Sequence, residues 1–250
     1  MALLEEFEKQ GNWLFKYRSF LPLIVLFIGT ALYLRTELYP ETFILEETPY
    51  EIYYETTALI ISLAGLFVRV YTVGYTPKNT SGRNTGQGQL ADTLNTTGIY
   101  SIVRHPLYLG NFLMWFGPAM LTGHFWFMIA FILFYWLYYE RIMFAEEQFL
   151  RKKFGTKYLD WSIKTPAFIP SFKNFKKSDL PFSWKKVLKK EKNGLFALFL
   201  IFCVFNIAGE FIESATDYNY FLIGMSVLTG ISYLVLKFLK KRTNLLTEEN

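Results

Sequence analysis

Long runs of apolar residues alternate with short polar stretches along most of this chain. A helix crosses a bilayer with about 20 such residues, so the run at 107–139 is too long for one crossing. It carries a break at "GPAMLTGHF" (117–125), which predicts two helices joined by a tight turn. Because each half is slightly short for a full crossing, a re-entrant hairpin is the alternative. The five nearly uncharged runs are 21–34, 52–75, 107–139, 195–209 and 219–236. They predict an all-α, polytopic integral membrane protein with about six transmembrane helices and a central helical hairpin.

Basic and acidic residues are distributed unevenly over the connections between these runs. Residues 35–51 contain one arginine and five glutamates, and 210–218 contain three acidic residues but no lysine or arginine. Residues 141–194 hold fourteen lysines or arginines, and 237–242 add four more. Cytoplasmic loops are enriched in Lys and Arg. We therefore expect both termini, and any site built from the basic loops, to face the cytoplasm.

The composition of the chain bears on whether it binds nucleic acid, the membrane surface or a metal. Charged residues make up 19% of the chain, below the roughly 25% typical of soluble domains, and the net charge is +5. We interpret this excess as attraction to the membrane surface and expect no nucleic-acid partner. The single cysteine, Cys203, excludes an intrachain disulfide or a thiolate metal cluster, and we expect no metal.

Two kinds of polar connection stand out. Residues 1–20 and 179–193 combine aromatic or apolar residues with charges, which is typical of helices lying on the membrane surface. Residues 76–99 and 145–178 form long polar loops on the same predicted side, flanking the central hairpin, and loops of this length are often functional. A site made from both loops would open to the cytosol and the inner leaflet.

The stretch "GIYSIVRHPLYLG" (98–110) places Arg104 and His105 at the mouth of the central hairpin. Arg104 is either a positive-inside anchor or a functional group. A neutral imidazole adds nothing as an anchor, so His105 indicates binding or proton chemistry. Pro106 favours the first turn of a helix, which then carries Tyr108.

A second constellation, "YYERIMFAEEQFL" (138–150), lies at the inner end of the fourth span. Glu140 and Glu147 share one helical face, and Tyr139 and Glu146 share the next. We expect a polar pocket there, although Arg141 could simply pair with nearby glutamates. Arg69 lies near the inner end of the second span, where snorkelling to the interface accounts for it.

Together these motifs resemble those of the isoprenylcysteine carboxyl methyltransferase and phospholipid methyltransferase family. The recurring pattern is G-x-Y-x-x-x-R-H-P-x-Y-x-G, followed by a Glu-Glu pair and FG-x-x-Y. The match covers about residues 60–172, and the residues that fit are Gly98, Tyr100, Arg104, His105, Pro106, Tyr108, Gly110, Glu146, Glu147, Phe154, Gly155 and Tyr158. The resemblance implies a helical membrane methyltransferase that uses S-adenosyl-L-methionine.

The resemblance also implies roles for particular residues. Arg104, Arg141 and Glu147 would act on the acceptor, with Arg141 offset by one residue from the family position. The cofactor would contact Asp92, Thr93, Leu94, Asn95, Tyr100, His105, Pro106, Leu107, Tyr108 and Glu146. The chain then divides into 1–59 (interfacial segment, first span and start of the second), 60–172 (methyltransferase core), 173–194 (basic interfacial linker) and 195–250 (two added spans and a basic tail).

These expectations favour methylation of a lipid or lipid-linked acceptor at the cytoplasmic leaflet. An anionic carboxylate or phosphate needs an orienting arginine and no base, whereas a phospholipid amine would need a base such as a glutamate. The arginines favour O-methylation, and N-methylation of an amine headgroup is the alternative. A non-catalytic membrane binding or transport protein that retains the family core is the third reading. The two added spans could wall a lipid entrance or mediate self-association.

Overall fold

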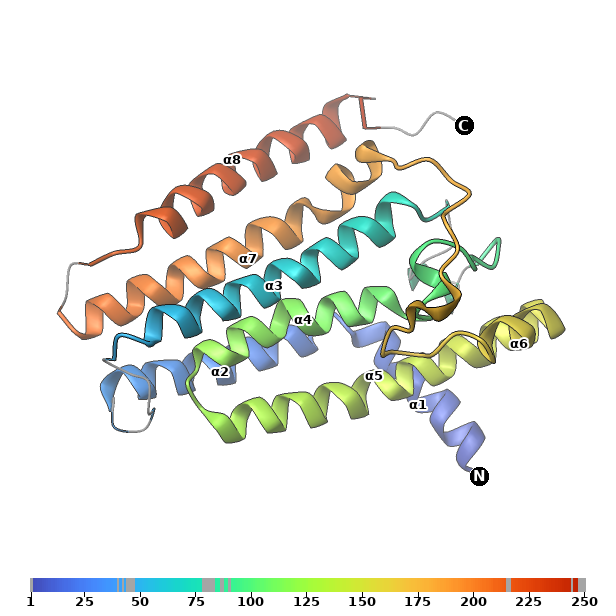
Figure 1. Ribbon diagram of the computed structural model, residues 1–250, viewed down its shortest axis with the longest axis horizontal. Helices are drawn as coiled ribbons and strands as arrows, with labels where there is room; N and C mark the ends of the chain where they lie inside the picture. Colours follow the sequence, from blue (N-terminus) through green and yellow to red (C-terminus); the bar gives the residue numbers. More distant parts are fainter. Residues whose placement is uncertain are drawn as a thin grey trace.

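Helices that run along one long axis make up most of the molecule. Figure 1 shows α2, α3, α4, α5, α7 and α8 side by side, with the short α1 and α6 at one end. The computed structural model describes residues 2–39, 41, 43, 48–77, 84–85, 88–89, 91–214, 217–243 and 245–246. The helices are α1 (Leu3–Tyr17), α2 (Leu21–Leu38), α3 (Glu51–Gly74), α4 (Pro106–Leu121), α5 (Phe125–Phe154), α6 (Thr156–Ser162), α7 (Trp184–Ile212) and α8 (Tyr220–Arg242). Two short helical turns, η2 (Ile99–Ser101) and η3 (Phe172–Asn174), and a pair of two-residue strands, β1 (Asn84–Thr85) and β2 (Gly88–Gln89), complete the described elements.

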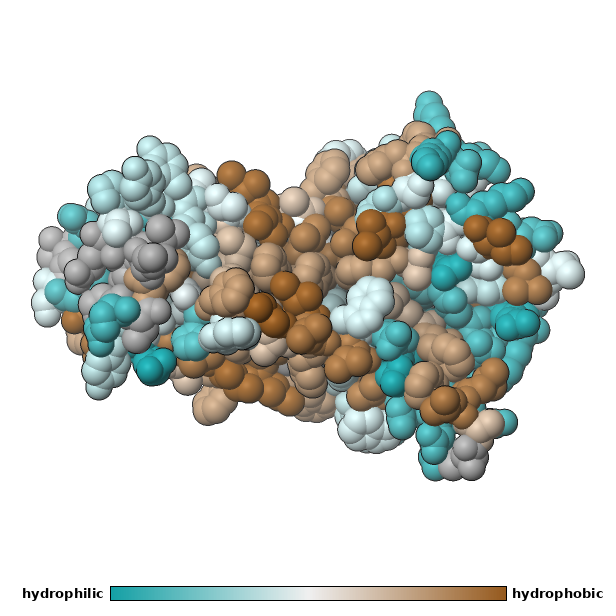
Figure 2. Space-filling view, turned by 60° about the horizontal axis from the view of Figure 1, so that its bottom comes forward, coloured by the Kyte–Doolittle hydropathy of each residue, from teal (hydrophilic) through white to brown (hydrophobic). Residues whose placement is uncertain are grey.

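Four of these helices, α3, α5, α7 and α8, are long and apolar enough to cross a membrane. The count is five if α1 and α2, which meet at a 70° bend, form one broken span. Helix α4 has 16 residues, so it is the short member of the bundle. Figure 2 shows a broad apolar band across the middle of the molecule, with hydrophilic residues gathered toward the ends. The expected all-helical membrane protein is confirmed, and the number of long spans is slightly below the expected six.

The central hairpin folds as the sequence predicts. Helix α4 ends at Leu121 and α5 begins at Phe125, with Gly123 between them at φ +62°, a conformation that favours glycine. The Thr36 hydroxyl of α2 donates a 2.8 Å hydrogen bond to the Thr122 carbonyl and braces the turn. Pro118 lies inside α4 rather than in the turn, so the break begins one helical turn later than its sequence suggests.

Helices α3 and α4 approach each other closely because glycines face the contact. A Cβ at Gly65 would lie 2.6 Å from the Gly110 carbonyl oxygen, and one at Gly117 would lie 2.0 Å from the Ser62 hydroxyl. Small residues at such positions let helix backbones approach within a membrane. The contact fixes the start of α4, where the candidate site lies.

The C-terminal part departs from the sequence-based expectation. Residues 184–193, expected to be a separate helix on the membrane surface, form the first turns of the continuous helix α7. The Ser183 hydroxyl accepts a hydrogen bond from the Lys186 amide and caps the helix. The basic helix therefore enters the bundle directly. Part of the expected polar loop 76–99, residues 78–83, 86, 87 and 90, lies outside the described residues.

Candidate functional site

The site begins with a tight turn that leads into α4. Gly98 adopts φ +60°, η2 follows, and Pro106 starts α4 with its ring in the first turn. Residues 166–176 run alongside this turn and bond to it along its length. The Arg104 amide donates to the Pro166 carbonyl at 2.9 Å, the His105 amide to Ala167 at 3.1 Å, and the Gly98 amide to Lys176 at 2.8 Å. Residues 166–176 therefore form a strap that holds the turn before α4.

His105 lies between two carboxylates supplied by α5. Its Nε2 is 2.9 Å from Glu147 Oε1, and its Nδ1 is 3.5 Å from Glu146 Oε2. The imidazole is buried, with 7% of the residue exposed. Burial lowers the pKa of His105, but the hydrogen bonds and negative charges of Glu146 and Glu147 outweigh burial and raise it above its ordinary value. The geometry favours a doubly protonated ring that bridges the two carboxylates.

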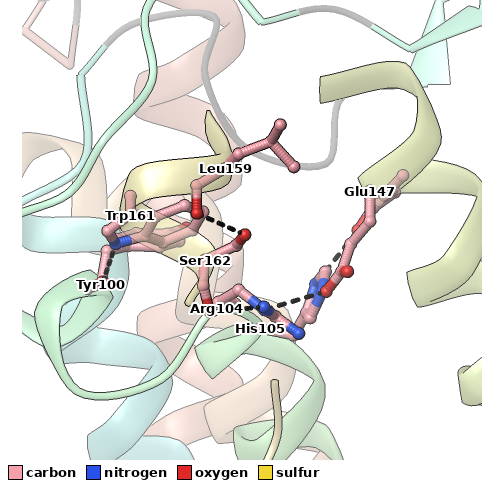
Figure 3. A network of polar contacts seen from close by, with 8 residues as sticks. Tyr100, Arg104, His105, Glu147, Leu159, Trp161 and Ser162 are labelled. Carbon is pink, nitrogen blue, oxygen red and sulfur yellow. Dashed lines mark hydrogen bonds and ion pairs between the residues drawn. The ribbon is translucent and has the colours of Figure 1, made fainter. Parts of the chain in front are cut away.

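Arg104 completes the polar cluster on the Glu147 side (Figure 3). Its Nε is 3.0 Å from Glu147 Oε1, and a terminal nitrogen donates to the Ser162 carbonyl at 2.9 Å. The guanidinium thus ties the turn before α4 to the end of α6. Glu147 faces two cationic groups, Arg104 and His105, whereas Glu146 contacts His105 at the longer distance.

Tyrosines surround the carboxylate pair. The Tyr108 ring stacks on the His105 ring with their centroids 5.7 Å apart. The Tyr139 ring packs against Tyr108, with 4.8 Å between the two ring centroids. Burial raises the pKa of the Tyr100 hydroxyl, and the nearby charge of Glu146 raises it further. Burial also raises the pKa of Tyr158, with the charge of Glu147 adding to it. These phenols stay protonated and can donate hydrogen bonds.

The structure brings together most of the residues that the sequence singled out, namely Tyr100, Arg104, His105, Pro106, Tyr108, Glu146 and Glu147. Leu107 follows in the first turn of α4 and is half-buried. Asp92 and Thr93 are exposed, and Leu94 and Asn95 are half-buried, in the segment that leads into Gly98. Their cofactor contacts stay predictions.

Arg141 lies elsewhere. It pairs with Glu140 at 3.0 Å, and its guanidinium sits 3.5 Å from the centre of the Phe7 ring in α1. This face of α5 packs against α1 rather than against α4. The structure therefore separates Arg141 from His105 and the glutamate pair.

Two arginines have contacts that the sequence did not reveal. Arg69, interpreted as snorkelling, makes a two-pronged ion pair with Glu191 of α7 at 2.8 Å and also hydrogen-bonds Asn111 of α4. Arg18, in the bend between α1 and α2, stacks on Phe15 at 3.9 Å and lies close enough to Tyr108 and Tyr139 to act on them electrostatically. In the sequence, Arg18 is simply a basic residue just before the first apolar run, and nothing there points to Tyr108.

Comparisons with known proteins concern the part of the chain that carries this site. Residues 55–157 match the family described as Phospholipid methyltransferase. A protein-S-isoprenylcysteine O-methyltransferase of Schizosaccharomyces pombe is 32% identical over 117 residues, which are 47% of this chain and 50% of the relative. A cobalt-zinc-cadmium resistance protein of Cupriavidus metallidurans is 32% identical over 45% of this chain and 50% of its own.

A methanethiol S-methyltransferase of Bradyrhizobium diazoefficiens is 38% identical over 82 residues, 31% of this chain and 29% of that protein. The chain thus spans about half the length, or less, of the curated relatives it matches. No solved structure matches it significantly.

Proposed function

We propose that this membrane protein is a methyltransferase that uses S-adenosyl-L-methionine, and the match of residues 55–157 to the phospholipid methyltransferase family supports this proposal. The observation that carries the proposal is the cluster of the buried His105 with the half-buried Glu146 and Glu147, beside Tyr100 and Tyr108. These groups lie where the two polar loops meet the central hairpin. Residues 60–172 would form the methyltransferase core.

The chemistry of the donor set fits this cofactor. S-adenosyl-L-methionine carries a sulfonium and an ammonium group, and both suit a carboxylate and the faces of tyrosine rings. Glu146 is the carboxylate with more capacity to accept, since its contact with His105 is 3.5 Å whereas Glu147 has His105 at 2.9 Å and Arg104 at 3.0 Å. The cofactor would supply an electrophilic methyl group. Tyr100, His105, Tyr108 and Glu146 would hold it, together with Pro106, Leu107 and residues 92–95.

The protein's own work in such a reaction is positioning. Glu147 and Arg104 fix His105, and His105 in turn orients Glu146 toward the tyrosines. Methyl transfer needs an in-line approach of acceptor and methyl group, so rigid placement supplies much of the rate. The strap at residues 166–176 would support this placement, because its backbone hydrogen-bonds to Arg104 and His105.

The acceptor would be an anionic lipid or lipid-linked group, methylated on oxygen. Arg18 lies close enough to Tyr108 to act on it electrostatically, which makes it the candidate arginine for orienting the acceptor. An arginine orients a carboxylate or phosphate, and such an acceptor needs no general base. Isoprenylcysteine is the acceptor named for one relative.

The site would face the cytoplasm, with both termini on the same side. The fourteen lysines and arginines of residues 141–194 lie toward the site end, in the last turns of α5, in α6, in the first turns of α7 and in the segment between α6 and α7, and the basic end of α8 lies there too. Residues 210–218, at the other end, have no lysine or arginine. This asymmetry matches the positive-inside rule.

Cofactor binding by the purified full-length protein in detergent tests the proposal. Calorimetry should give saturable binding of S-adenosyl-L-methionine, and Glu146→Gln should weaken it by about tenfold or more, the effect of one charge-assisted contact. Glu140→Gln is the matched control, since Glu140 lies on the same helix but pairs with Arg141. Absence of binding to the folded wild-type protein would overturn the proposal.

Transfer itself is tested with cofactor labelled in the methyl group. Lipid extracts and prenylcysteine analogues are incubated with the protein, and products heavier by one methyl are sought by mass spectrometry. Arg18→Gln should raise KM for an anionic acceptor while leaving cofactor affinity unchanged. An amine product would instead favour N-methylation.

A further inference from the structure

The α7–α8 hairpin lies outside the family match, which ends at residue 157, and one end of the hairpin reaches the site end of the bundle (Figure 1). The sequence places many lysines at this end. Helix α7 begins there and α8 ends there, so the two helices are antiparallel. The lysines near this end are Lys185, Lys186, Lys189, Lys190 and Lys192 of α7, and Lys237, Lys240 and Lys241 of α8.

An aromatic contact sets how the two helices align. Phe196 of α7 stacks on Tyr233 of α8 with centroids 5.5 Å apart and packs against Gly230, where a Cβ would lie 3.1 Å from the ring. In an antiparallel pair, the turn before Phe196 lies beside the turn after Tyr233. Lys192 is therefore brought to the level of Lys237 and Lys240.

Lys192 is a buried cation among like charges. It is 9% exposed, and its ammonium donates a 2.7 Å hydrogen bond to the Lys189 carbonyl. The ammonium groups of Lys240 and Lys189 both lie within electrostatic range of it. Lys237 holds its own ammonium 5.3 Å from the centre of the Tyr233 ring.

Among the described residues, no carboxylate lies within 4.0 Å of the ammonium groups of Lys189, Lys192, Lys237 or Lys240. The carboxylates that form ion pairs do so with other basic residues. Burying an ammonium costs free energy unless an opposite charge or hydrogen bonds compensate, and neighbouring like charges add to that cost. The cluster thus has the electrostatics of a site for an anion.

We propose that Lys189, Lys192 and Lys240 bind the phosphate of an anionic phospholipid headgroup between the ends of α7 and α8. The three lysines come from two helices that pack against each other, so a phosphate between the helix ends would face ammonium groups of both. Their depth fits a headgroup, because the apolar part of α7 starts at Leu195, within one turn of Lys192. Basic pockets between membrane helices are known to bind such headgroups.

The surroundings favour a lipid over a soluble anion. Leu188, Leu234, Val235 and Phe238 are large apolar residues near this end of the hairpin, and between 42% and 62% of each is exposed. Acyl chains would cover these side chains while the phosphate sits among the lysines. Bound lipid would cancel the repulsion between α7 and α8 and stabilise the hairpin by mass action.

Thermal unfolding of the full-length protein in neutral maltoside detergent tests this proposal. Added phosphatidylglycerol should raise Tm in a saturable way, while phosphatidylcholine should not. The pair Lys192→Gln and Lys240→Gln should weaken the apparent affinity for phosphatidylglycerol about thirtyfold, as expected for the loss of two lysine contacts near a membrane surface. The pair Lys192→Arg and Lys240→Arg should keep it.

The matched control is Lys173→Gln with Lys177→Gln, which removes the same charge from exposed positions in another segment. An equal loss with this control would mean that only net charge matters and would overturn the site. An equal shift with inorganic phosphate alone would assign a free anion and overturn the lipid. If the glutamine pair does not fold, native mass spectrometry of the wild-type protein decides, since it should retain phosphatidylglycerol in preference to phosphatidylcholine. Loss of methyl transfer in any sample would not affect these readouts.

Discussion

His105 is the titratable group whose environment has the clearest consequence for stability. The two carboxylates beside it raise its pKa above the value of about 6.5 expected for the unfolded chain. A group with a raised folded pKa contributes its full stabilisation below the unfolded pKa and loses it as pH rises through the folded pKa. The protonated ring is therefore a source of stability that alkaline pH removes.

We expect Tm in detergent to fall as pH rises above about 6.5, and His105→Asn to flatten that part of the profile. Each unit by which the pKa is raised corresponds to about 1.4 kcal/mol. The chain has two histidines, so His124→Asn, which removes the histidine far from the glutamate pair, is the matched control. The same slope in His105→Asn would show that other groups govern the pH dependence.

Glycines in the α3–α4 contact give a second test at single positions. Gly117→Ala places a Cβ 2.0 Å from the Ser62 hydroxyl and 2.5 Å from the Ala58 carbonyl oxygen, so a helix must shift. Overpacking of this kind costs about 1–3 kcal/mol. Gly224→Ala in α8 has open space around the new atom and should be neutral or stabilising. Chemical denaturation in mixed micelles measures both, and equal effects would contradict the packing argument.

At the scale of elements, an ion pair between the partly buried Arg69 and the buried Glu191 joins α7 to the core. Arg69 of α3 pairs with Glu191 of α7, whose side chain is 4% exposed, and also holds Asn111 of α4. The Tyr139 hydroxyl of α5 lies beside the Asn111 side chain. The pair therefore connects α7 to the helices that carry the candidate site.

Removing one partner of a buried pair leaves an uncompensated charge, which costs about 3–5 kcal/mol. Glu191→Gln should destabilise the protein by an amount of this order, and Glu191→Leu combined with Arg69→Met should recover much of it. Glu8→Gln breaks a pair whose lysine partner, Lys152, is 64% exposed, and should cost no more than about 1 kcal/mol. Unfolding free energies would refute the prediction if the two single variants behaved alike.

The elements also show what the sequence could predict. The length of the apolar run and its turn residues located the hairpin between α4 and α5, because Gly123 and the apolar run are local signals. The grouping of His105 with Glu146 and Glu147 followed from motif resemblance, since 41 and 42 residues separate them in the chain. The Arg69–Glu191 pair spans 122 residues and has no local signature, so it was interpreted as snorkelling. Arg18 was missed for the same reason: the bend between α1 and α2 brings it to Tyr108.

At the scale of the whole molecule, the distribution of charge and the arrangement of the helices both distinguish one end of the bundle from the other. Helix α1, the end of α8 and the candidate site all lie at one end of the bundle, and the α7–α8 connection lies at the other (Figure 1). Lys177 is exposed at the site end, and Asp217 is exposed at the far end. The proposed orientation therefore assigns these two residues to opposite sides of the membrane.

Cysteine labelling tests that orientation. Cys203 is buried within α7 and is replaced first, by Cys203→Ala, to give a background without thiols. In that background, a membrane-impermeant maleimide applied to intact cells should label Asp217→Cys and should not label Lys177→Cys. After the membrane is permeabilised, both should react, which controls for buried or unfolded protein. Labelling of Lys177→Cys in intact cells would place the His105 site outside the cytoplasm, and it would remove the inner-leaflet lipid as the source of the acceptor.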